Sequence, residues 1–214
     1  GFIEDLTKYL YKNKCFRELE TYIQKFNTDM AGRVIGALID IEAPNDYITK
    51  LLNSVQHTAP IDDLILQTMK RERIKLLEPI LYARAQAGSI DPSTNNGIVL
   101  LAVLSNRNGE KMLRENQYYN PKFVGDILSK RDAHLACIAY ARGKCDKELI
   151  ELTNQHQLYK EQARYCVERQ DPELWAKVLS PENEHMKLVV DAVISTALPE
   201  CDDPDKVSQT VKAF

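Results

Sequence analysis

The sequence predicts an all-α protein, specifically an α-solenoid (superhelix) of short antiparallel helical hairpins stacked one after another. Apolar residues recur at spacings of three, four and seven, as they do on helices that each bury one stripe. The β-branched residues follow the same period and do not alternate as in a strand. About fourteen short helices joined by loops of roughly two to six residues are hard to close around one core, whereas hairpins bury their apolar faces by stacking.

A repeated pattern between residues 130 and 175 supports this interpretation. The run KRDAHL at 130–135 is echoed by RQDPEL at 169–174, and each run begins a helix after a basic end to the previous one. Asp132 and Asp171 are the expected N-caps, because an aspartate side chain accepts hydrogen bonds from the first backbone N–H groups of a helix. The repeated unit is therefore a pair of helices.

Six helices are expected in the first part of the chain. The first two are separated only by a turn at Asn13-Lys14 and should form an antiparallel hairpin. Pro44-Asn45-Asp46 ends one helix and caps the next. Pro60-Ile61-Asp62-Asp63 is a strong helix start, with two carboxylates beside the positive end of the helix. The expected helices cover roughly residues 2–13, 15–26, 31–41, 46–55, 60–73 and 74–87.

The sixth of these helices contains Pro79. An interior proline removes one backbone hydrogen bond, so we expect it to bend a helix that runs from Ile74 to Ala87. Gly88 follows as the expected C-cap, because glycine readily adopts the left-handed conformation that ends many helices.

The rest of the chain continues in the same way. Asp91-Pro92 begins a helix that reaches Leu104, although Gly97 weakens its first half. The stretch 130–175 is punctuated at Arg142-Gly143 and at Asn154-Gln155-His156. The other expected helices cover residues 110–115, 121–128 and 172–179, a helix led by Ser180-Pro181 to about residue 197, and a segment opened by Asp203-Pro204.

Composition excludes several classes of protein. The formal net charge of -3 lacks the basic excess that nucleic-acid binding requires, and no apolar run approaches the roughly 18 residues of a membrane span. The five cysteines are odd in number and scattered, which indicates a reducing compartment and not a disulfide framework. The chain opens with Gly1-Phe2 and ends inside a helical pattern, so we expect it to be part of a longer protein.

One group of residues invites a metal-site hypothesis: His134, Cys137, Cys145, His156 and Cys166. A structural zinc site needs two matching ligand pairs, and the second pair is missing, so buried, inert cysteines are the preferred interpretation. Nucleophilic catalysis needs a base that the fold places beside Cys or Ser, and the dispersed glycines form no phosphate loop. We therefore expect no catalytic, cofactor-binding or metal residues, and metal analysis should find no stoichiometric zinc.

Two surface features allow alternative interpretations. The basic run at 70–75 (KRERIK) could bind phosphates or a membrane surface, but basic residues at a helix C-terminus also offset its partial negative charge, and the latter is preferred. The pairs Tyr9 with Tyr11 and Tyr118 with Tyr119 could bind partners. The preferred interpretation places each ring in a seam between helices with its hydroxyl at solvent or a backbone carbonyl.

Several runs resemble the clathrin heavy-chain family along essentially the whole chain. The most specific are KRDAHLACIAYARGKCDKELI (130–150), LRENQYYNP (113–121), RQDPELWAKVL (169–179) and VSQTVKAF (207–214). GFIEDLTKYLYKN at the start and QKFNTDMAGRVIGALIDI support them, while residues 83–111 depart most. Vacuolar sorting proteins share this type of repeat but lack these runs.

The resemblance implies a segment of the distal leg, with one clathrin heavy-chain repeat at residues 1–136 and the start of the next at 137–214. It implies a structural coat component whose rod-like leg makes lateral contacts in a polyhedral cage on the cytoplasmic face of coated pits and vesicles. The implied partners are other heavy chains in the cage, with the clathrin light chain bound mostly outside this segment, and neither nucleic acid nor direct membrane insertion is implied.

The sequence also allows two other functions, each with its own signature, and it offers candidate residues for a pH response and for a seam between hairpins. A helical-repeat adaptor or vacuolar-sorting tether that binds peptides would show a contiguous apolar or single-sign surface patch, and a metalloenzyme would show bound metal. His134, His156 and His185 are candidates for pH-sensitive assembly contacts, since histidine changes charge near neutral pH. Leu174 and Trp175 should lie in the seam between neighbouring hairpins.

Overall fold

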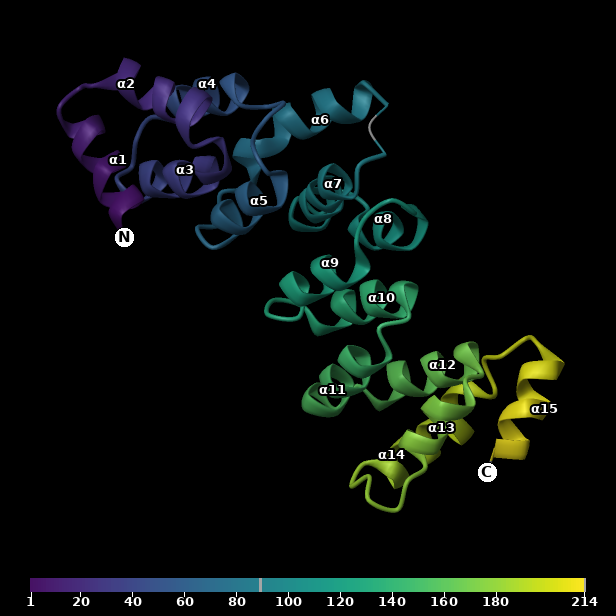
Figure 1. The fold of residues 1–214 in the computed structure, drawn as a ribbon. Coiled ribbons are helices and arrows are strands. Elements are labelled where there is room, and N and C mark those ends of the chain that lie inside the picture. The colour runs from purple at the N-terminus through teal and green to yellow at the C-terminus, as the bar shows by residue number, and fades with distance from the viewer. Residues whose placement is uncertain (89, 214) are drawn as a thin grey trace. The chain divides into compact units, whose positions relative to one another are not determined.

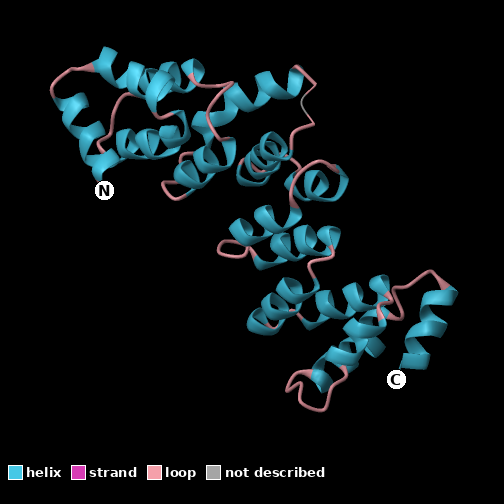
Figure 2. Cartoon of the chain, viewed as in Figure 1, coloured by secondary structure: helices cyan, strands magenta, loops and turns pink. Residues whose placement is uncertain are grey.

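The computed structural model describes residues 1–88 and 90–213, and this part of the chain consists of helices joined by loops and turns (Figures 1 and 2). It contains fifteen α-helices, short 3₁₀ and π segments, and no strand within the described residues. The predicted all-α class is therefore confirmed. The chain divides into two compact units, Gly1–Asn120 and Pro121–Phe214, which are called the first and second unit below.

The first unit is a succession of hairpins in which each helix packs mainly on helices close to it in the sequence. The closest neighbours are α3 with α1 and α5, α7 with α5 and α6, and α8 with α7. This local pattern is typical of stacked hairpins. The helices are α1 Phe2–Lys12, α2 Phe16–Thr21, α3 Ala31–Asp40, α4 Asn45–Ser54, α5 Ile61–Met69, α6 Glu78–Gln86, α7 Pro92–Leu104 and α8 Gly109–Glu115.

The second unit follows the same plan. The helices in closest contact are α9 with α10, α10 with α11, and α12 with α14. The π segment Val193–Ala197, which extends α14, also packs on α12. The helices are α9 Pro121–Leu128, α10 Ala133–Gly143, α11 Asp146–His156, α12 Tyr159–Arg169, α13 Pro172–Val178, α14 Met186–Ala192 and α15 Pro204–Ala213. The repeat boundary predicted between residues 136 and 137 falls inside α10, and it stays a prediction.

Three aspartates that the sequence places before helices act as N-caps. The backbone N–H of Thr94 donates to Asp91 at 3.0 Å, that of Leu135 donates to Asp132 at 3.1 Å, and that of Glu173 donates to Asp171 at 2.9 Å. Each bond satisfies a backbone donor that has no partner within its own helix. The predicted caps Asp132 and Asp171 are confirmed.

The predicted bend at Pro79 is wrong. A 3₁₀ segment, Ile74–Leu77, comes first, and α6 begins at Glu78, so Pro79 lies in the first turn of a new helix. Proline is well suited to this position because a helix does not use the N–H of its first residues. Gly88 behaves as predicted: its φ is +77°, and its N–H donates to the carbonyl of Ala85 at 2.9 Å.

The helix expected after Pro181 begins later than predicted. Residues 181–185 form a turn, and α14 starts at Met186. The side chain of Asn183 stabilises this turn, because its amide donates to the carbonyl of Val178 at 2.7 Å and accepts from the N–H of His185 at 3.1 Å. Such local bonds of asparagine compete with helix formation.

Candidate interaction surface

Charged pairs link successive hairpins on the surface of the first unit. Arg33 contacts Glu4 at 2.8 Å, Arg71 contacts Asp40 at 2.7 Å, and Arg107 contacts Glu78 at 3.0 Å. Their sequence separations are 29, 31 and 29 residues, which is the length of about one hairpin. Side chains of both signs therefore pair between successive hairpins along the surface of this unit.

The first two of these pairs lower the pKa of their carboxylates. Hydrogen bonds from the Arg33 guanidinium lower the pKa of Glu4 to about 2, and those from Arg71 hold the pKa of Asp40 below its usual value. Both carboxylates therefore remain charged well into the acidic range.

A denser polar cluster joins three helix ends in the second unit. Arg169, the last residue of α12, contacts Asp146 at 3.2 Å and Asp171 at 2.9 Å, and the Tyr165 hydroxyl also donates to Asp146. Burial acts to raise the pKa of Asp146, but the hydrogen bonds from Arg169 and Tyr165 keep it below its usual value. This cluster was not predicted from the sequence, because only the fold brings residues 146 and 169 together.

The basic run at 70–75 serves contacts within the protein. Arg71 donates to the carbonyl of Gln67 at 3.0 Å near the end of α5, besides its pair with Asp40, and Arg73 donates to the side chain of Asn45. The preferred interpretation, in which this run serves the C-terminal end of a helix, is supported. Two of the cations that a phosphate would use are engaged in these bonds.

The cysteine and histidine residues of the metal hypothesis do not form a site. Cys137 and Cys166 are buried, and burial raises the pKa of each thiol to about 12, so both stay protonated. Cys145 is half-buried, and its pKa is also raised by burial. Across residues 1–88 and 90–213, no three His, Cys, Asp or Glu side chains are grouped so that they could hold a metal ion.

Two of the three candidate histidines lie in contacts between helices. His134 is 3.5 Å from Glu161, and the His185 ring lies against Tyr159 with the hydroxyl 3.1 Å from Nδ1. His156 is exposed in the last turn of α11. Their part in a pH response stays a prediction.

The four predicted seam tyrosines divide evenly. Tyr119 is buried and its hydroxyl donates to the carbonyl of Leu113 at 2.8 Å, while Tyr11 packs against Phe16 and Tyr47 with ring centroids 5.5 and 5.6 Å apart. Tyr9 and Tyr118 are instead 63% and 54% exposed, so the prediction of a seam position is wrong for them. Nothing in the spacing of these residues separated the inward ring from the outward one.

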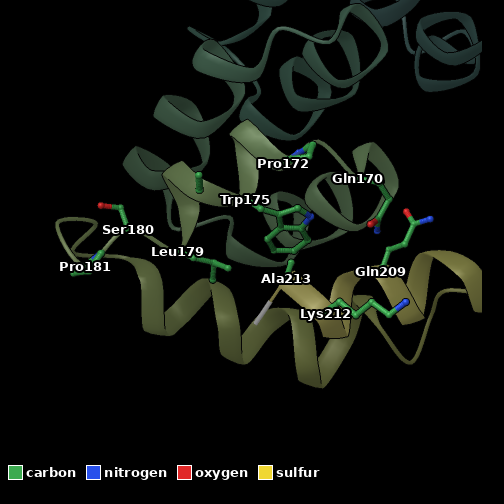
Figure 3. Close-up of a pocket in the computed structure, with 10 residues that line it drawn as sticks. Gln170, Pro172, Trp175, Leu179, Ser180, Pro181, Gln209, Lys212 and Ala213 are labelled. Carbon is green, nitrogen blue, oxygen red and sulfur yellow. The ribbon is translucent and has the colours of Figure 1, made fainter.

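Trp175 lies in a seam of the second unit, as predicted. Its side chain is 5% exposed and Leu174 is 2% exposed. The indole lies at an open groove of about 740 Å³. Figure 3 shows it with Leu179 to one side and Ala213 of α15 opposite. The groove is lined by both apolar side chains and the polar groups of Gln170, Gln209 and Lys212.

The exposed apolar side chains are spread over both units. The largest exposures lie on α1, on the π segment Tyr22–Phe26, on the connection after α6, on the segment after α14 and on α15; they belong to Phe2, Tyr9, Phe26, Ile90, Ile194 and Val211. Such a distribution over several helices differs from the single apolar face of a peptide-binding groove. Within the described residues, no helix combines the length and the apolar character needed to cross a membrane.

Comparison with known proteins agrees with this architecture. A clathrin family model, described as a region in clathrin and VPS proteins, matches residues 52–190. Clathrin heavy chains from Dictyostelium discoideum and Drosophila melanogaster are 49% and 45% identical over 213 residues, and clathrin heavy chain 2 from Homo sapiens is 44% identical over 214 residues. These matches cover 100% of the chain and 13% of each relative. The chain therefore belongs to the clathrin repeat family.

Proposed function

We propose that the chain is a structural segment of a clathrin coat, from the distal leg of a heavy chain. Its stacked hairpins make lateral contacts with the legs of other heavy chains in a polyhedral cage during coated-vesicle formation, endocytosis and intracellular protein transport. The observation that carries the proposal is the match to clathrin heavy chains along the whole chain at 44–49% identity. The proposed location is the cytoplasmic face of coated pits and vesicles.

The surface chemistry supports contacts that are individually weak. Exposed cations and carboxylates alternate on single helices, as in the pairs Arg114 with Glu110 on α8 and Lys147 with Glu151 on α11. Surface charges of this kind contribute little each, about 0–1 kcal/mol. Many such contacts acting together stabilise a lattice, and their weakness allows it to come apart.

The proposal assigns no chemical step to this segment. Its two most buried thiols stay protonated, and its polar clusters, such as Asp146 with Arg169, lie between helix ends. In this proposal the partners are other heavy chains, and the light chain binds mostly outside residues 1–214. The predicted repeats at 1–136 and 137–214 form part of the same proposal.

Cage assembly by the full-length protein tests the proposal. Exposed charges of α11 and α13 are reversed in sets, for example Lys147 and Lys177 to Glu together with Glu151 to Lys, and similar sets are made on α8 and α15. We expect at least one set to raise the protein concentration needed for cages without changing the thermal unfolding temperature. Unchanged assembly in every set would contradict the proposal and favour a role as a peptide-binding repeat.

A further inference from the structure

Two Asn-Gly pairs occur in the chain, and the fold places them in opposite environments. Asn96-Gly97 lies inside α7, where Asn96 is 2% exposed. Asn108-Gly109 lies at the turn between α7 and α8, where Asn108 is exposed and has a φ of +53°. Asparagine followed by glycine is the pair most open to intramolecular attack, because glycine has no Cβ to shield its backbone nitrogen.

Asn96 is held at both ends of its side-chain amide. Its Nδ2 donates to Asp62 at 3.1 Å, and its Oδ1 accepts from the backbone N–H of Asn120 at 2.7 Å. The neighbouring Gly97 is packed tightly, because a Cβ there would lie 2.6 Å from a methyl group of Leu81. The amide carbon of Asn96 therefore cannot turn toward the nitrogen of Gly97 while α7 is folded.

Asn108 is held much less firmly. In the described structure its side chain makes no capping hydrogen bond to α8. Gly109 is the first residue of α8, where a backbone N–H has no acceptor within the helix. Asn106, two residues earlier, also has a left-handed backbone with a φ of +52°, so the turn is made of residues outside the helical conformation.

We propose that Asn108 is a site of spontaneous deamidation. The backbone nitrogen of Gly109 attacks Cγ of Asn108 and forms a five-membered succinimide, while the bond from Cγ to Nδ2 breaks. The proton from the Gly109 nitrogen passes through water to the leaving group, which departs as ammonia. Water then adds to either carbonyl of the succinimide and leaves aspartate or isoaspartate, so water is the only co-reactant.

The isoaspartate product would disturb α8. The carbonyl of Asn108 accepts from the N–H of Met112 at 3.0 Å, and in isoaspartate this group becomes a free carboxylate while the chain runs through Cγ. The chain at Gly109 is tightly packed, because a Cβ there would lie 2.5 Å from Cα of Val103, so it has little space to shift when the Cβ of residue 108 lengthens the main chain. The buried Leu113 and the bond that its carbonyl accepts from Tyr119 depend on α8.

Asn96-Gly97 serves as an internal control for Asn108-Gly109. The folded protein is kept for several days at mildly alkaline pH, digested and analysed by mass spectrometry. The peptide with Asn108 is expected to gain about one mass unit and to split into two species, at least about tenfold more than the peptide with Asn96, because α7 must open before it reacts. In concentrated urea both pairs should react. An unmodified Asn108 in the folded protein, or equal modification of both pairs, would overturn the proposal.

Two variants separate the deamidation of Asn108 from the effect of isoaspartate on α8. Asn108→Gln needs a six-membered ring for the same attack and is expected to lose the mass gain, and a retained gain would mean that another residue reacts. Asn108→Asp has the charge of the product on a normal backbone. Hydrogen exchange in α8 is expected to rise in the aged wild type but not in this variant when it is freshly prepared, before its Asp-Gly pair can form the same succinimide. Equal exchange in the two would contradict the assigned isoaspartate.

Discussion

In both units, neighbouring helices approach closely where one of them has a glycine. The side chain that packs against the glycine differs between the two units. In the first unit, a Cβ on Gly36 of α3 would lie 2.8 Å from the guanidinium of Arg71, which pairs with Asp40. In the second unit, a Cβ on Gly125 of α9 would collide with the ring of Tyr140. One seam is thus closed by a charged group at the surface and the other by a buried aromatic ring.

This difference has physical consequences. A guanidinium at the end of a flexible side chain can move aside, and its ion pair responds to pH and salt. An enclosed ring cannot move, and the Tyr140 hydroxyl is further fixed by its bond to Asp126 at 2.8 Å. We therefore expect the seam at Gly36 in the first unit to tolerate small changes and to be sensitive to acid, and the seam at Gly125 in the second unit to show the reverse.

The largest effect is expected at the buried aromatic ring of Trp175. Trp175→Ala removes a side chain that is 5% exposed, so it should lower the free energy of unfolding by roughly 3–5 kcal/mol. Denaturant titration measures the loss, with the exposed Tyr118→Ala as the control that stays within about 0.5 kcal/mol. A loss under about 1 kcal/mol for Trp175→Ala would mean that the indole does not fill a seam.

The two glycines test the comparison directly. Gly125→Ala forces a methyl group against Tyr140 and should cost about 2 kcal/mol in unfolding free energy. Gly36→Ala displaces only the guanidinium of Arg71, and the better helix propensity of alanine, about 1 kcal/mol, offsets that loss. Equal costs for the two substitutions, measured by denaturant titration, would remove the distinction between the seams.

Replacing Gln162 of α12 by leucine is expected to change stability less than Trp175→Ala or Gly125→Ala, and to increase it. This side chain is fully buried, and among the described residues neither its Oε1 nor its Nε2 has a hydrogen-bond partner. Gln162→Leu should therefore raise the free energy of unfolding by about 1 kcal/mol. The control is Gln170→Leu, which should lower it, since the Gln170 amide donates to Thr210 at 2.7 Å. Destabilisation by Gln162→Leu would show that the amide has a partner in solution.

The acid response of the first unit gives the smallest effect. The pKa of Glu4 is about 2 in the folded chain against 4.5 ordinarily, and that of Asp40 is also lowered, so both stabilise the fold above about pH 4.5. This stabilisation is lost as pH falls toward 2. The double variant Glu4→Gln and Asp40→Asn should show a shallower loss of thermal stability with acid than the wild type. Because Asp146 titrates similarly in both proteins, an identical acid profile would contradict the assignment.

The sequence was informative where structure depends on near neighbours. The caps Asp132 and Asp171 and the positive φ of Gly88 follow from residues within a few positions, and all three were predicted correctly. The helix boundaries near Pro79 and Pro181 were predicted wrongly, because a proline indicates that a boundary is near but does not fix the residue at which the next helix begins. Which helix begins there is decided by further side chains, such as the amide of Asn183.

Contacts between hairpins could not be predicted from the sequence. The pair Arg71 with Asp40 and the bond of Arg169 to Asp146 depend on the distance between helix faces, which glycine and aromatic packing set. The order of charged residues in the sequence does not give the distance between helix faces. The same limit explains why Tyr9 and Tyr11 could not be distinguished, although only Tyr11 packs in a seam.

In both units, each hairpin packs on the hairpin next to it in the sequence. Zero-length coupling of lysines to carboxylates tests it directly, because only groups in contact react. We expect links of Lys50 to Glu20, Lys122 to Glu148 and Lys206 to Glu168, whose charged atoms lie 2.9, 2.5 and 2.7 Å apart. Links that join Lys50 to the far end of the first unit, in place of Glu20, would contradict it.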